Sequence, residues 1–176
     1  MTSKFHKLLQ VQIRNEFTAS QQYVALAVWF DGQDLPQLAR HFYRQSVEER
    51  NHAMMITQYL LDNDIPVSVP GVDEVRNEFA DAAELVTLAL QQERAVTDEI
   101  VNLAKVARDE EDYKGEQFTQ WFLKEQVEEV ASMRTLLNVV KRSNGNLFDV
   151  ENFLARESAG DSGADPTAPR AAGGKL

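Results

Sequence analysis

The chain of 176 residues contains no cysteine. Disulfide bonds, thiolate metal sites and a cysteine nucleophile are therefore excluded. The sequence also lacks an apolar run approaching the roughly 18 residues that a membrane-spanning helix needs, so we expect no membrane segment. Its first residues, "MTSKFHKLLQVQIRNEF", show neither an uninterrupted apolar h-region nor a small-residue cleavage site. We therefore expect no signal peptide and a cytoplasmic location.

Basic residues are in the minority, with 18 Lys and Arg against 28 Asp and Glu, and the net charge is −10. A surface this acidic repels nucleic-acid phosphate, and no basic stripe along the sequence offsets that repulsion. The composition therefore predicts no nucleic-acid partner. It favours cations as ligands.

Glycine and proline are scarce, with eight and five copies, and most of them lie in two short regions. Four long segments outside these regions have apolar residues at helical spacing, and a shorter fifth segment follows the break "SNGN". We expect Asp34 to cap the second helix and Asn146 to cap the fifth. The predicted helices cover residues 4–30, 35–62, 82–108, 116–141 and 147–157.

The last nineteen residues have a different composition, since thirteen of them are Gly, Ala, Ser or Pro. Such a segment has almost nothing apolar to bury, which predicts a flexible tail over residues 158–176. Residues 1–157 then form one helical domain. The terminal Gly-Gly-Lys-Leu is a possible docking address for a partner protein.

The connection lengths predict the topology. Short loops join the first helix to the second and the third to the fourth, so each pair should be antiparallel. The link of about 17 residues after the second helix can extend over roughly 55 Å, while a helix of about 28 residues is about 42 Å long. The link can thus return along the whole molecule and make the second and third helices parallel. This predicts an all-α four-helix bundle with one long crossover.

Each predicted helix keeps an apolar stripe that a glutamate interrupts near its middle, and in "VEERNHAMM" a histidine follows one turn later. These residues lie in phase with the core and not with the solvent. Four unpaired carboxylates in a core would cost several kcal/mol each, and no Lys or Arg occupies the four stripes. The remaining alternatives are protonated glutamates, an error in the phase, or bound metal. The residues are Glu16, Glu49, His52, Glu93 and Glu129.

Bound metal fits this residue set well. Two divalent cations would neutralise four carboxylates, and His52 would add one neutral nitrogen ligand. Oxygen-rich coordination of this kind suits iron or manganese.

Together these residues resemble the non-haem bacterial ferritins. Glu16, Tyr23, "EERNH", Glu93 and "EQVEE" carry the resemblance, which covers about residues 4–157. It implies a ferritin-like four-helix bundle with a long crossover and a short fifth helix, and it implies homo-oligomeric shells of 24 subunits. Members of this family oxidise Fe(II) with dioxygen or peroxide and store the ferric product as mineral. The alternative is a bundle that sequesters divalent metal without catalysis.

The resemblance also implies roles for individual residues. The first iron site would consist of Glu16, Glu49 and His52, and Glu49 would bridge to a second site. Core packing is the other reading of two aromatic residues near the centre, Tyr23 and Trp121. The second site would hold Glu93 and Glu129 beside Gln126, and a third, looser site would hold Glu48, Glu125 and Glu128 and share Glu129.

Two differences from related families narrow the expectation. Bacterioferritins carry a haem-ligating Met directly after the bridging glutamate, where this sequence has Arg50, so we expect no haem. They also repeat Glu-x-x-His on the fourth helix, where this sequence has Gln126-x-x-Glu129.

Glu116 is a candidate for an acidic iron-entry channel. The three glutamates of the third site could alternatively belong to a solvated inner face.

Overall fold

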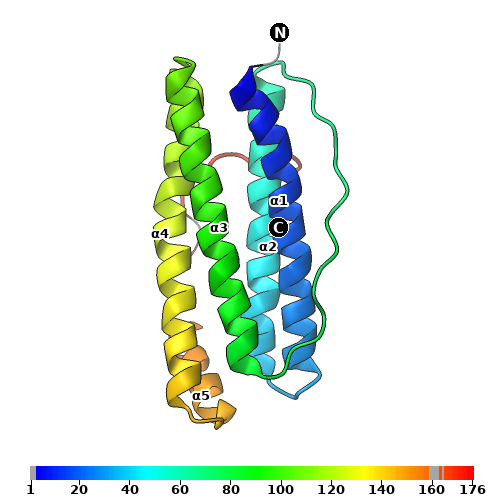
Figure 1. The fold of residues 1–176 in the computed structure, drawn as a ribbon, viewed down its shortest axis with the longest axis vertical. Coiled ribbons are helices and arrows are strands. Elements are labelled where there is room, and N and C mark those ends of the chain that lie inside the picture. Colours follow the sequence, from blue (N-terminus) through cyan, green and yellow to red (C-terminus); the bar gives the residue numbers. More distant parts are fainter. Residues whose placement is uncertain (1–2, 159–162, 164) are drawn as a thin grey trace.

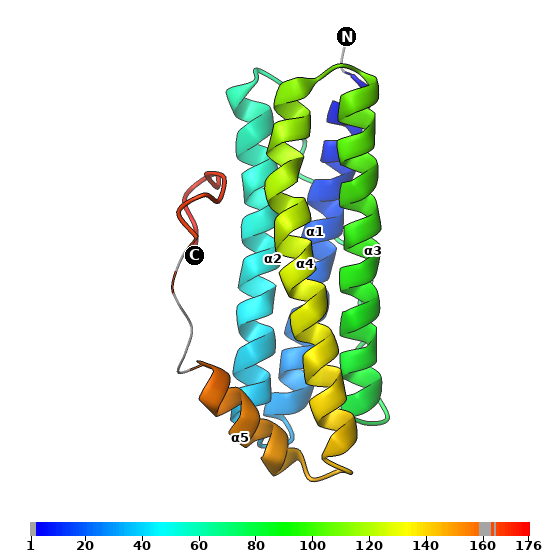
Figure 2. The same ribbon diagram turned by 90° about the vertical axis from the view of Figure 1, so that its left-hand side faces the viewer.

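The computed structural model describes residues 3–158, 163 and 165–176. Five helices and no strand are found in this part of the chain, as the sequence predicts (Figure 1). Four helices of 27 to 30 residues form the bundle, and a fifth of 12 residues lies across one end of it (Figure 2). The helices are α1 (Lys4–Asp31), α2 (Pro36–Asp62), α3 (Ala82–Asp109), α4 (Tyr113–Arg142) and α5 (Leu147–Ser158).

The long crossover connects opposite ends of the bundle. Residues 63–81 run along α1 from the end of α2 to the start of α3, so α2 and α3 are parallel (Figure 1). The side chain of Gln22 holds this segment by two hydrogen bonds of 2.8 Å to the backbone of Arg76. Nearer the N-terminus of α1, the side chain of Gln10 donates to the carbonyl of Pro66 at 2.9 Å. The predicted topology is confirmed.

Two apolar clusters fill the bundle, and the mid-helix polar residues belong to neither of them. One cluster includes Leu26, Phe30 and Leu136 from the half of the bundle near α5. The other includes Leu9, Ile56 and further residues from the half near the N-terminus. The clusters consist of apolar side chains at helical spacing, which explains why these segments fold against one another.

The start of α2 is stabilised by a carboxylate from a distant part of the chain. The α2 N-cap is Leu35, which makes no side-chain cap, and the expectation that Asp34 caps this helix is wrong because Asp34 turns the chain at φ 59°. Glu151 of α5 accepts hydrogen bonds from the backbone N–H groups of Gln37 at 2.9 Å and Leu38 at 2.8 Å instead. These bonds satisfy donors that a helix start leaves without intrahelical partners.

The start of α4 also differs from the expected one. The helix begins at Tyr113, three residues before Glu116, because the side chain of Asp112 accepts a hydrogen bond from the N–H of Gly115 and caps it. Glu110, just before this turn, accepts hydrogen bonds of 2.9 Å from the N–H groups of Lys4 and Phe5. One connection therefore supports the starts of both α4 and α1.

The C-terminal segment lies beside α2 (Figure 2). Ala168 and Ala171 pack against the apolar cluster near the N-terminus, and the N–H of Ala172 donates to the carbonyl of Met54 at 3.0 Å. Arg170 pairs with Asp62 at 2.9 Å. The sequence analysis expects this segment to have almost nothing apolar to bury, and Ala171, which is 8% exposed, is an exception. Residues 159–162 and 164 of the predicted tail lie outside the described residues.

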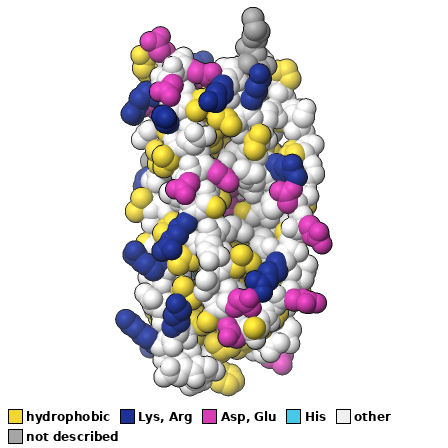
Figure 3. Space-filling model, in the orientation of Figure 1, with side chains coloured by type: hydrophobic (Ala, Val, Ile, Leu, Met, Phe, Trp, Pro, Cys, Tyr) yellow, Lys and Arg dark blue, Asp and Glu magenta, His cyan; other side chains and the backbone are white. Residues whose placement is uncertain are grey.

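Charged side chains of both signs are interspersed over the face seen in Figure 3. None of the helices in the described ranges is both long and apolar enough to cross a membrane.

Candidate metal centre

A layer of buried polar side chains crosses the middle of the bundle, and all four long helices contribute to it. Glu16, Glu49 and Glu93 are at most 1% exposed, and His52 is 4% exposed. α4 contributes Gln126 and Glu129, which are 3% and 9% exposed. The helical phase places these polar groups inside the bundle, as the sequence predicts.

Three of these residues bring their ligand atoms together. One atom each from Glu16, Glu49 and His52 lies within 4.8 Å of the other two. His52 turns its Nδ1 toward Glu49, 3.4 Å from that residue's Oε2. Two carboxylates and an imidazole at this spacing can hold one divalent metal ion.

Glu93 is oriented from two sides. The hydroxyl of Tyr23 donates to Glu93 Oε1. Gln126 Nε2 donates to Glu93 Oε2 at 3.2 Å and to its backbone carbonyl at 3.1 Å. Tyr23 and Gln126 thus fix the orientation of the Glu93 carboxylate, because each donates a hydrogen bond to one of its oxygens.

The glutamates assigned to a third site lie around one cavity. Glu48, Glu125 and Glu128 line a cavity of about 540 Å³ together with Glu129 of the buried layer. Residues of α2, α4 and α5 line this cavity, among them Arg44, Ser132 and Leu154. Glu129 belongs both to the cavity lining and to the buried layer, so the cavity borders the layer.

Burial dominates the electrostatics of the layer. Loss of hydration raises the pKa of Glu16 and of Glu49 well above the usual range, and neighbouring carboxylates raise both pKa values further. The pKa of Glu129 is raised well above its ordinary value for the same reasons, and burial raises the pKa of Glu93. A cluster of this kind holds protons until a cation replaces them.

Within the part of the chain that the structure describes, no Lys or Arg pairs with the four buried glutamates. Oε2 of Glu16 and Oε2 of Glu49 are buried and accept no hydrogen bond from the described residues. Orphaned carboxylate oxygens deep in a bundle are costly unless a ligand fills the coordination. The donor set therefore fits divalent metal.

Two aromatic rings hold the imidazole of His52. Trp121 and Phe122 approach it edge-on, with ring centroids at 5.7 and 5.6 Å and interplanar angles of 74° and 75°. Phe122 is buried and belongs to the core, whereas Trp121 lies partly exposed beside it. Trp121 therefore contacts a candidate ligand from the surface side of the bundle.

The sequence analysis missed two glutamines that orient the carboxylates. Gln12 Nε2 donates to Glu16 Oε1 at 2.9 Å and to Glu99 Oε2 at 3.0 Å. Gln45 Nε2 donates to Glu48 Oε2. Both glutamines lie one turn from a carboxylate on the same helix, so the spacing of four or three residues was a usable signal.

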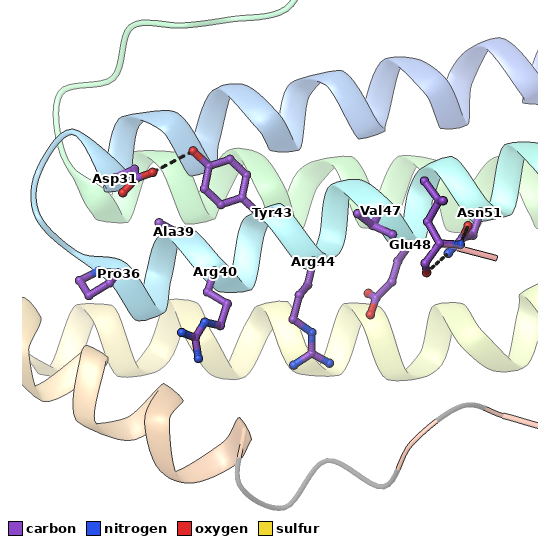
Figure 4. A pocket seen from close by; sticks show the side chains of 10 residues that line it. Asp31, Pro36, Ala39, Arg40, Tyr43, Arg44, Val47, Glu48 and Asn51 are labelled. Carbon is purple, nitrogen blue, oxygen red and sulfur yellow. Dashed lines mark hydrogen bonds between the residues drawn. The ribbon is translucent and has the colours of Figure 1, made fainter.

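A second concavity of about 530 Å³ lies on the outer side of α2. Tyr43 donates to Asp31 Oδ2 at 3.0 Å at one end, and Asn51 meets the C-terminal Leu176 at the other (Figure 4). Arg40 and Arg44 extend into the region between these ends (Figure 4). This concavity contains none of the buried glutamates and lies apart from the layer.

A four-helix bundle defines the ferritin-like class of proteins when a long crossover makes its second and third helices parallel and a layer of glutamates and histidine is buried in its middle. The model of the ferritin-like domain matches residues 6–143 of this chain. The chain belongs to the ferritin family.

Individual relatives agree with this assignment. Ferritin BfrB of Mycolicibacterium smegmatis is 63% identical over 176 residues, which cover 100% of this chain and 97% of that protein. A bacterial non-heme ferritin of Staphylococcus aureus is 34% identical over 134 residues, covering 76% of this chain and 81% of that protein. The open-pore ferritin of the archaeon Archaeoglobus fulgidus superposes with a TM-score of 0.84 at 25% identity, covering 90% and 98% of the two chains.

Proposed function

We propose that this protein is an iron-storage ferritin whose bundle oxidises Fe(II) to Fe(III) with dioxygen or peroxide. The observation that carries the proposal is the buried convergence of Glu16, Glu49 and His52 within 4.8 Å. Fe(II) is the substrate in this reaction. Each ion gives up one electron, and the oxidant takes up the electrons together with protons.

Two iron positions account for the arrangement of the layer. Glu16 and His52 would bind the first ion, and Glu49 would bridge it to a second ion held by Glu93 and Glu129. Because buried carboxyl groups with raised pKa values hold protons, iron binding would release protons from the layer. Carboxylates then balance the additional charge of the ferric product.

The neighbours of the layer have supporting roles in this proposal. Tyr23 and Gln126 would fix the carboxylate of Glu93, because both donate hydrogen bonds to it. The ferric product would leave along the acidic cavity, where a third, weaker site would form. We propose no haem in the bundle, since Arg50 follows Glu49 and has no thioether to offer. The cavity ligands would be Glu48, Glu125, Glu128 and Glu129.

The variant Glu49→Ala tests the reaction and the bridging role together. Because a bridging ligand serves both ions, we expect the initial rate of Fe(II) oxidation to fall by at least about tenfold. Oxygen uptake and the appearance of Fe(III) absorbance measure that rate. The matched control is Glu74→Ala, an exposed glutamate in the crossover, which should oxidise iron at the wild-type rate.

The same experiment separates the two functions that the sequence leaves open. A bundle that only sequesters divalent metal would bind Fe(II) without consuming oxygen. Wild-type protein that takes up no oxygen would favour sequestration. Unchanged oxidation in Glu49→Ala would contradict the bridging role.

We also propose that the chain assembles into a shell of 24 subunits in the cytoplasm. Several large apolar side chains are exposed on the single chain, including Phe148 of α5 at 74%, Val127 at 71% and Tyr113 at 70%. Contacts between subunits would cover such groups. Light scattering should give about 480 kDa for 24 copies of a 19.9 kDa chain. A monomer or dimer at micromolar concentration would contradict the shell.

A further inference from the structure

The C-terminal segment contacts Trp121, and the ring of Trp121 lies against the candidate metal ligand His52. Trp121 Nε1 donates a hydrogen bond of 3.1 Å to Asp165 Oδ2. The indole of Trp121 packs edge-on against the imidazole of His52. Asp165, Trp121 and His52 therefore form a chain of direct contacts from the tail into the buried layer.

The carboxylate of Asp165 is itself held by further contacts. Its Oδ1 accepts hydrogen bonds from Thr167, at 2.8 Å from the backbone N–H and at 2.6 Å from the hydroxyl. Its Oδ2 also pairs with Lys124 Nζ at 3.3 Å. Both oxygens therefore have partners, so Asp165 presents a fixed acceptor to the indole.

The rest of the segment is attached to the same helix that carries His52. Arg170 pairs with Asp62, Ala172 donates to the carbonyl of Met54, and the N–H of Leu176 donates to Asn51 Oδ1 at 3.2 Å. These contacts lie on both sides of His52 along α2. They hold the segment on the bundle independently of Asp165.

We propose that Asp165 is a positioning residue for the ferroxidase site proposed above, acting through Trp121 on His52. The imidazole must present Nδ1 toward Glu49, and the two edge-on rings restrict its rotation. Phe122 is fixed by the core. Trp121 is only partly buried, and its hydrogen bond to Asp165 fixes the plane of its ring.

A double-mutant cycle tests this role. Asp165→Ala and Trp121→Phe should each lower the initial rate of Fe(II) oxidation by about fivefold to tenfold. This is at or below the roughly tenfold lower end of the effects of groups that orient metal ligands, because Asp165 acts through Trp121. The double variant should lose no more than the stronger single variant, because both changes remove the same contact. The matched control is Arg170→Ala, which breaks the ion pair of the tail with Asp62 and leaves the hydrogen bond between Asp165 and Trp121 in place, so it should keep the wild-type rate.

Two measurements do not depend on turnover. In a Trp29→Phe background Trp121 is the single tryptophan, since the sequence has two. Asp165→Ala should change its emission spectrum, and Arg170→Ala should leave the spectrum unchanged. The affinity for Co(II), measured by calorimetry as a substitute that air does not oxidise, should fall by about fivefold in Asp165→Ala.

The possible outcomes separate this inference from the proposed function. Wild-type rate and Co(II) affinity in Asp165→Ala would overturn the positioning role, and so would fully additive losses in the double variant. Equal losses in Arg170→Ala would show that general docking of the tail matters and would also overturn it. A wild type that oxidises no Fe(II) would overturn only the proposed reaction. The emission spectrum and the Co(II) affinity would then still decide the role of Asp165.

Discussion

The buried carboxylates should make the metal-free bundle less stable as the pH rises, and Glu49→Gln measures this directly. Glu49 is 1% exposed, its Oε2 accepts no hydrogen bond from the described residues, and burial raises its pKa well above the usual range. Glutamine keeps nearly the same shape and cannot ionise. The substitution therefore removes the titration of one buried group with little change in packing.

The sign of the effect follows from proton linkage. In the unfolded chain this carboxyl ionises near its ordinary pKa of about 4.3, whereas the folded chain keeps it protonated to higher pH. The unfolded state thus binds fewer protons, and the free energy of unfolding falls with rising pH by up to about 1.36 kcal/mol per pH unit. Removing this group should leave the free energy of unfolding of the metal-free protein almost unchanged at pH 4. At pH 7.5 it should raise that free energy by at most about 4 kcal/mol.

Thermal unfolding of chelator-treated protein at both pH values provides the assay. For a chain of this size, 1 kcal/mol corresponds to a change in Tm of about 2–4 °C. Glu74→Gln, at an exposed position of the crossover, is the control and should change stability by less than about 0.5 kcal/mol at either pH. Adding Mn(II) should stabilise the wild type more than Glu49→Gln, because metal binds the ionised site.

Two results would refute the reasoning. If Glu49→Gln destabilised the metal-free protein at pH 7.5, the carboxylate would be satisfied in the fold without metal. If its effect were the same at pH 4 and pH 7.5, the group would not titrate differently in the folded and unfolded chains.

Three further predictions concern other parts of the fold. Glu151→Ala removes the acceptor at the start of α2 and should cost about 1 kcal/mol, with faster amide hydrogen exchange there as the check. Gly115→Ala places a Cβ against the ring of Phe5 and should cost about 1–3 kcal/mol in urea unfolding. His41→Phe replaces an imidazole whose pKa burial lowers to about 4. Because the unfolded chain takes up that proton near pH 6.5, the wild type loses stability as the pH falls from 6.5 to 4, and the variant should be more stable at pH 4 by up to about 3 kcal/mol.

The sequence alone determined the helices and the position of the polar layer, because both depend on spacing within single segments. Apolar residues at helical intervals define one face of each helix, and Glu16, Glu49, Glu93 and Glu129 lie on those faces by phase alone. The length of the crossover fixed the parallel arrangement of α2 and α3, because the chain has to reach the far end of the bundle.

The tertiary structure alone decided the contacts between residues far apart in the chain. Glu151 caps α2, and Glu110 supports the start of α1, across separations of 113 and 105 residues. No local pattern marks such a carboxylate, since its partners are backbone N–H groups that every helix start offers.

The docking of the C-terminal segment on the bundle also could not be predicted from a local sequence pattern. Its composition offers almost nothing apolar to bury. In the structure Ala168 and Ala171 nevertheless pack in the apolar cluster near the N-terminus, and Asp165 accepts a hydrogen bond from the indole N–H of Trp121. Small side chains bury little area each, so their docking depends on a surface that other helices build. The sequence placed the glutamates inside the bundle, and the packing of helices decided which of their oxygen atoms meet.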